Sequence, residues 1–83
     1  MKLVITTTKD VVTGEMAQQP QMFRNIEESK RAFAYAMKQL KTDSAIPVTD
    51  YQLYKIGEID TYTMEITPGV EFLANGAQFA VGE

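Results

Sequence analysis

Residues 25–41, which read N-I-E-E-S-K-R-A-F-A-Y-A-M-K-Q-L-K, decide the fold because they predict one strong helix. Asn25 is a good N-cap residue, and Glu28 three positions later completes a capping-box pattern. Acidic residues fill the first turn and lysines the last, which suits the helix dipole at both ends. Apolar side chains recur at helical spacing and predict a buried face formed by Ile26, Ala32, Phe33, Ala36, Met37 and Leu40.

Strand-like segments precede this helix. Residues 1–7 alternate in the manner of a β-strand, and Thr13-Gly14 predicts a turn that pairs this strand with the next one as a hairpin. Residues 17–23 contain three glutamines and a proline without any period, so we expect a loop there.

Strand-like segments also follow the helix, after a connecting loop over residues 42–49. Residues 51–56 are rich in aromatic and branched side chains on both faces, which predicts a central strand that ends near Gly57. Residues 61–67 alternate cleanly and predict a half-exposed strand, after which Pro68-Gly69 predicts another turn.

The 83 residues are therefore expected to form a single α+β domain. Its architecture is an antiparallel sheet of four to five strands with a single helix packed on one face, in the order ββαββ. Residues 68–83 are expected to add a short last strand and a loose tail. A core this small rarely provides much stability alone, so a homodimer or higher homo-oligomer is expected.

Composition excludes several function classes. Without cysteine or histidine, the chain lacks thiolate ligands, the commonest metal ligand and the commonest general base. Its glycines are scattered and form no phosphate-binding loop. The acidic pairs Glu58/Asp60 and Asp43/Asp50 lack a third ligand or a base and are expected to be solvated. We therefore expect no enzyme, no metal, no cofactor, no small-molecule substrate and no membrane partner.

Residues 50–60 read D-Y-Q-L-Y-K-I-G-E-I-D, which resembles the DYxLYxIGxFD core of the small nonstructural protein of gokushoviruses, icosahedral phages of the Microviridae with single-stranded DNA genomes. The opening M-K-L-V, the pair Gln19-Pro20 and the run 31–33 (R-A-F) fall in the same order as similar pieces of that family. The resemblance covers roughly residues 1–60. It departs at Ile59, where the family commonly has Phe, and at Thr61, where it has an acidic residue.

The resemblance implies a phage nonstructural protein made in the host bacterial cytoplasm and absent from the coat. It also implies a DNA-binding role in the replication or packaging of a single-stranded genome. The net charge of −3 counts against DNA binding, since nucleic-acid binders usually carry a basic balance. Two alternatives therefore stay open: a module that engages a host or phage replication factor without touching DNA, and a minor scaffold or internal protein.

The polar side of the predicted helix is the candidate surface for single-stranded DNA. Arg31, Tyr35 and Lys38 stand at i, i+4 and i+7, which combines cations for phosphates with a ring on which a base can stack. Lys30 and Lys41 flank them, and Arg24 would meet a phosphate at the helix N-terminus or pair with Glu28. The alternative is an ordinary solvated helix face.

A second candidate surface depends on the strands. Tyr51, Tyr54 and Tyr62 would form a stacking platform if they shared an exposed sheet face, whereas strand tyrosines are more often core or edge residues. Lys2, Lys9 and Lys55 would add positive charge to such a face, depending on strand register.

Overall fold

The computed structural model describes residues 1–43 and 47–79, with the backbone alone for residues 41–43. Five strands form one antiparallel sheet, and a single long helix follows the third strand. The elements are β1 (Lys2–Asp10), β2 (Glu15–Met16), β3 (Gln21–Phe23), α1 (Ile26–Asp43), β4 (Tyr51–Asp60) and β5 (Ile66–Asn75), with short 3-10 helices η1 (Val48–Asp50) and η2 (Gly76–Phe79). The predicted α+β class, with one helix on an antiparallel sheet, is confirmed.

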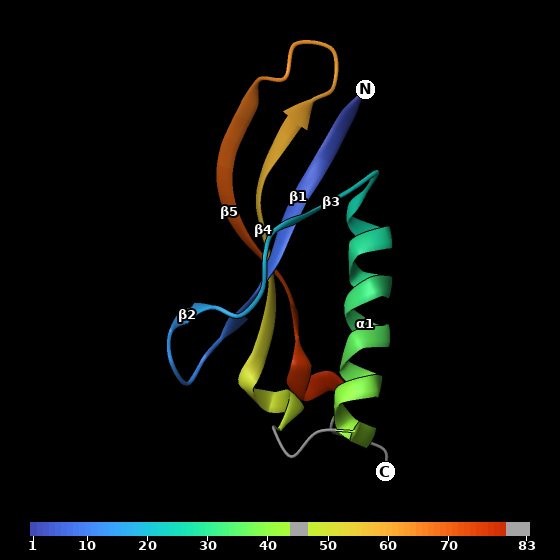
Figure 1. Ribbon diagram of the computed structural model, residues 1–83, viewed down its shortest axis with the longest axis vertical. Helices are drawn as coiled ribbons and strands as arrows, with labels where there is room; N and C mark the ends of the chain where they lie inside the picture. The colour runs from blue at the N-terminus through green and yellow to red at the C-terminus, as the bar shows by residue number, and fades with distance from the viewer. Residues whose placement is uncertain (44–46, 80–83) are drawn as a thin grey trace.

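The strands run in the order β2-β1-β4-β5, and β3 pairs with β1 on the same edge as β2. The α1 helix lies along one face of this sheet, which we call the near face, and no element covers the opposite, far face in the described part of the chain (Figure 1). The β4–β5 hairpin extends past the N-terminal end of α1, which makes the molecule elongated, with extents of 44 × 23 × 18 Å.

The hydrophobic core lies between α1 and the near face. Phe33 and Met37 come from the helix and pack against Val48, Leu53 and Ala74 from the sheet and its connections. Of the six apolar side chains predicted on the helix, Phe33 and Met37 are buried and Ala36 and Leu40 pack against this cluster, whereas Ala32 is exposed. A buried hydrogen bond between the hydroxyls of Thr6 and Ser29, 2.7 Å apart, joins β1 to α1.

Register assigns side chains to the two faces. Thr6 pairs with Lys55, and Thr8 pairs with Leu53. These side chains lie on the near face, as the hydrogen bond between Thr6 and Ser29 of α1 shows. Side chains alternate along a strand, so Thr7 points to the far face together with Tyr54, its partner on β4. The register thus places Thr7 and Tyr54 on the face that α1 does not cover.

Three loop or turn predictions were wrong. Gln21–Phe23 is a strand rather than a loop, because the edge of β1 offers it backbone partners from Val4 to Thr6. Gly57 does not end β4; a Cβ there would lie 2.7 Å from the Thr67 carbonyl oxygen, so glycine lets β5 pass close by. Pro68-Gly69 lies within β5, where an edge strand tolerates a proline that cannot donate a hydrogen bond.

The predicted strand over residues 61–67 is also wrong, because residues 61–65 form the turn between β4 and β5. Asp60 organises this turn: its carboxylate accepts hydrogen bonds from the N–H groups of Tyr62 (2.8 Å) and Thr63 (3.4 Å). These bonds, that of Tyr62 first, lower the pKa of Asp60 below its ordinary value. The side chain of Asp60 thus outweighs the alternating pattern that predicted a strand.

The β1–β2 turn is built in the same way. Asp10 accepts from the N–H groups of Val12 and Thr13, as Asp60 does from Tyr62 and Thr63. The residue four positions after each aspartate has a positive φ. That residue is Gly14 (φ 77°) in the first turn and Met64 (φ 64°) in the second. Both turns carry the pattern D-x-x-T-x-E, at residues 10–15 and 60–65.

Candidate nucleic-acid interface

The outer face of α1 presents the predicted cationic and aromatic side chains to solvent. Phe33 and Met37 fix the orientation of the helix by burying the side that faces the sheet. Arg31, Tyr35 and Lys38 consequently lie on the opposite side, and all three are exposed, Tyr35 to 67%. The structure thus brings together the three side chains that the spacing predicted, which we call the helix stripe.

Positive charge is concentrated around the helix stripe. Residues 29–42 contain four of the eight Lys and Arg residues of the chain and no acidic residue: Lys30, Arg31, Lys38 and Lys41. Lys30 is half-buried beside the stripe, and the side chain of Lys41 lies outside the described residues. Although the whole chain carries a net charge of −3, this segment is locally basic.

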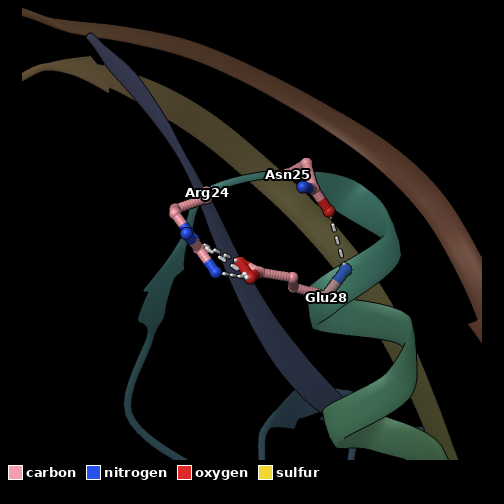
Figure 2. A network of polar contacts seen from close by, with 3 residues as sticks. All are labelled: Arg24, Asn25 and Glu28. Atoms are coloured by element: carbon pink, nitrogen blue, oxygen red, sulfur yellow. Dashed lines mark hydrogen bonds and ion pairs between the residues drawn. The ribbon is translucent and has the colours of Figure 1, made fainter.

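The N-terminal end of α1 uses its polar groups internally. The Arg24 guanidinium donates to both carboxylate oxygens of Glu28, the shortest bond being 2.8 Å, while the Asn25 side-chain oxygen caps the helix by accepting from the Glu28 N–H at 2.8 Å (Figure 2). The hydrogen bond from Arg24 lowers the pKa of Glu28, and the carboxylate raises the pKa of Arg24. Of the two predicted uses of Arg24, the structure therefore contains the pair with Glu28, and a phosphate would have to displace that carboxylate.

Acidic side chains gather away from the helix stripe, on the near face of the β4–β5 hairpin. Glu58, Asp60 and Glu65 surround a shallow hollow there together with Lys2. The sequence offered Lys55 as a further cation for DNA. Its Nζ lies 3.4 Å from the Oε2 of Glu58, so the two side chains form an ion pair. Within the described residues no group of three or more acidic side chains is arranged to hold a metal ion. The hairpin therefore holds an acidic cluster away from Tyr35 and Lys38, although Lys2 and Lys55 lie within that cluster. Two further acidic residues, Glu27 and Glu28, lie in the first turn of α1.

The three strand tyrosines do not form a shared platform. Tyr51 packs against the hydrophobic core, Tyr62 is exposed in the β4–β5 turn, and Tyr54 lies on the far face. Tyr54 contacts Phe72 edge-to-face, with ring centroids 5.7 Å apart, and the Lys9 Nζ is 5.8 Å from the centroid of its ring. The sequence alone does not identify Phe72 as a neighbour of Tyr54, because this contact depends on the register of β5 against β4.

The comparisons with known proteins add a family. The family model described as "Phage ORF5 protein" matches residues 3–79, which is nearly the whole chain. No curated protein and no solved structure matches the chain significantly. In the described residues, no helix combines the length and apolar character needed to cross a membrane.

Proposed function

Because the chain belongs to the phage ORF5 protein family, we propose that this phage protein is a nonstructural, non-enzymatic protein that binds single-stranded DNA during genome replication or packaging in the host bacterial cytoplasm. The resemblance of residues 50–60 to the small nonstructural protein of gokushoviruses supports this role and names the subgroup of phages. One structural observation supports it most: the exposed helix stripe lies in a segment with four cations and no acid.

The helix stripe has the chemistry that sequence-independent binding of single strands requires. Arg31 and Lys38 would neutralise successive phosphates, while the ring of Tyr35, exposed between them, offers a face on which a base can stack. Nothing in this arrangement reads base edges, so we expect little sequence preference. The acidic hairpin would repel the strand from the near face and leave it on the outer side of α1.

Titration of a fluorescent single-stranded oligonucleotide at several salt concentrations tests this proposal. The logarithm of the affinity should fall with the logarithm of the salt concentration by about 0.7 for each phosphate neutralised. The double variant Arg31→Ala/Lys38→Ala should flatten this slope by about 1.4. Tyr35→Ala should weaken binding by roughly 1–3 kcal/mol and leave the slope nearly unchanged.

Lys2→Ala is the matched control for Arg31→Ala, because it also removes one exposed cation, from β1 rather than from the helix. If binding depends on the helix stripe, Arg31→Ala should weaken it several-fold more than Lys2→Ala. Equal losses would mean that only the net charge matters, and wild-type binding by the Arg31→Ala/Lys38→Ala variant would refute this site. Absence of binding at low salt would refute the proposed function.

A second candidate function is supported by the tip of the β4–β5 hairpin. Tyr62 is 85% exposed there and Met64 75%, on an arm that projects beyond α1. Large apolar side chains on a projecting turn are suited to a protein partner, such as a host or phage replication factor. In that case Tyr62→Ser should abolish capture of the partner from infected cells, while Tyr35→Ser should leave capture unchanged.

A further inference from the structure

The far face of the sheet is apolar although nothing covers it in the described part of the chain. Five of its side chains each keep more than half of their surface exposed: Met16, Met22, Ile66, Val70 and Phe72. Five more are half-buried among them: Leu3, Ile5, Tyr54, Ile56 and Ile59. Lys9 is the charged residue among them, and its ammonium group lies over the ring of Tyr54.

The two faces of the β4–β5 hairpin show that this apolar character is not a general property of the strands. Where the hairpin extends beyond α1, no described residue covers its near face either. The side chains there are polar and come from the hairpin and the neighbouring β1: Lys2, Glu58, Asp60, Glu65 and Thr67. At the same level, the far face carries the cross-strand row Leu3, Ile59 and Ile66. The sequence thus alternates between polar residues on the solvated face and apolar residues on the other, which is the pattern of a sheet with one buried face.

From this alternation we infer that the far face is the interface with a second copy of this chain, packed sheet against sheet about a two-fold axis. The available area agrees with that occupant. A standard interface buries roughly 800 Å² per partner, about a seventh of the 5595 Å² of accessible surface of the chain. The five exposed side chains supply on the order of 500 Å², at about 100 Å² each, before the half-buried ones are added.

Two further features favour face-to-face packing of identical copies. Pro68 lies on the edge strand β5 and cannot donate a hydrogen bond, so it interrupts edge-to-edge pairing of two sheets. The far face also contains a hollow of about 330 Å³ lined by Met16, Tyr54, Ile56 and Val70, which can receive an apolar side chain of the other copy. Two-fold symmetry places the same hollow and the same side chains on both copies.

Single-stranded DNA is a less suitable occupant of this face, even though Tyr54 and Phe72 are aromatic. A strand of DNA needs several cations along its path, and among the described side chains of the far face Lys9 is the one cation. Most of the remaining side chains are aliphatic and offer no ring for a base.

Sedimentation equilibrium of the full chain over a range of concentrations tests the inference, using Val70→Glu and the matched control Val12→Glu. Val70 (78% exposed) lies in the far face, whereas Val12 (73% exposed) lies in the β1–β2 turn, so the two variants make the same chemical change at similar exposure. We expect the wild type and Val12→Glu to reach twice the 9.3 kDa chain mass. Val70→Glu should raise the dimer dissociation constant by at least about tenfold.

Met22→Glu, on β3 at the other side of the far face, is a second variant in case Val70→Glu fails to fold, and circular dichroism verifies the fold of each. A wild type that remains at 9.3 kDa at high concentration would overturn the inference, as would equal dissociation of the Val70 and Val12 variants. A monomer that binds an oligonucleotide and loses this binding through Val70→Glu would instead assign the face to DNA. Because the sedimentation experiment contains no nucleic acid, its result is independent of the proposed DNA binding.

Discussion

Replacing Met64 by Gly should stabilise the protein, although the substitution removes a large side chain. Met64 has a φ of 64°, a left-handed conformation that costs a residue with a Cβ about 1–2 kcal/mol relative to glycine. Glycine also increases the conformational entropy of the unfolded chain, which offsets about 0.5–1 kcal/mol of this stabilisation. Since Met64 is 75% exposed, little packing is lost. With the middle of both ranges, the net expectation is a stabilisation of about 0.5–1 kcal/mol.

Thermal unfolding followed by circular dichroism measures this effect. For a domain of this size, 0.5–1 kcal/mol corresponds to a rise in Tm of roughly 2–8 °C. The matched control is Tyr62→Gly in the same turn, because Tyr62 is exposed but does not have a positive φ. It should lower Tm, since there glycine adds only the entropic cost. Gly14→Ala should also lower Tm, by forcing a Cβ into the equivalent position of the β1–β2 turn.

A Tm of Met64→Gly at or below that of the wild type would refute this reasoning. It would mean that the side chain of Met64 forms a stabilising contact that outweighs its backbone strain. An equal change in Met64→Gly and Tyr62→Gly would show that the left-handed conformation is not the cause.

Four other substitutions test the packing and the turns. Gly76→Ala should destabilise the fold by about 2 kcal/mol or more, seen as a lower urea midpoint, because a Cβ there would overlap the Val48 carbonyl oxygen. Thr6→Val and Ser29→Ala should each cost roughly 1–3 kcal/mol by leaving one buried hydroxyl without its partner, and the double variant should cost clearly less than their sum. Asp60→Asn should reduce the loss of stability in acid, because folding lowers the pKa of Asp60. The ionised Asp60 therefore stabilises the fold fully above the ordinary carboxylate pKa of about 4, and this stabilisation is lost as the pH falls through the lower folded pKa. An unchanged acid-unfolding midpoint in Asp60→Asn would contradict that role.

The helix could be predicted because its signals are local. The apolar period and the N-cap act within one or two turns, and the structure contains both: Phe33 and Met37 are buried, and Asn25 caps the Glu28 N–H. The capping box is only half formed, because the Glu28 carboxylate instead accepts from Arg24. The helix stripe followed from the same period, since burying one side of a helix fixes which residues face solvent.

The central strand over residues 51–56 was predicted and lies within β4, whereas the turn after β4 and the start of β5 could not be predicted from the sequence pattern alone. Residues 61–67 alternate as a strand does, but the side chain of Asp60 satisfies two N–H groups of a turn and so decides the local structure. A signal did exist, since residues 60–65 repeat the D-x-x-T-x-E pattern of the β1–β2 turn at residues 10–15, with Met64 where the first turn has Gly14. The glycine, rather than the aspartate, was the feature that made the first turn recognisable.

The far face illustrates what one sequence leaves undetermined. Its apolar residues come from five strands, and only the register brings Leu3 beside Ile59 and Ile59 beside Ile66. The two proposals for this protein use opposite sides of the molecule, because the helix stripe lies on the outer side of α1 and the inferred interface lies on the sheet face away from it. Stacking two copies through the far face would leave both helix stripes on the outside, pointing in opposite directions. A short oligonucleotide would then contact one stripe only, whereas a long strand would have to wrap around the dimer to reach the second.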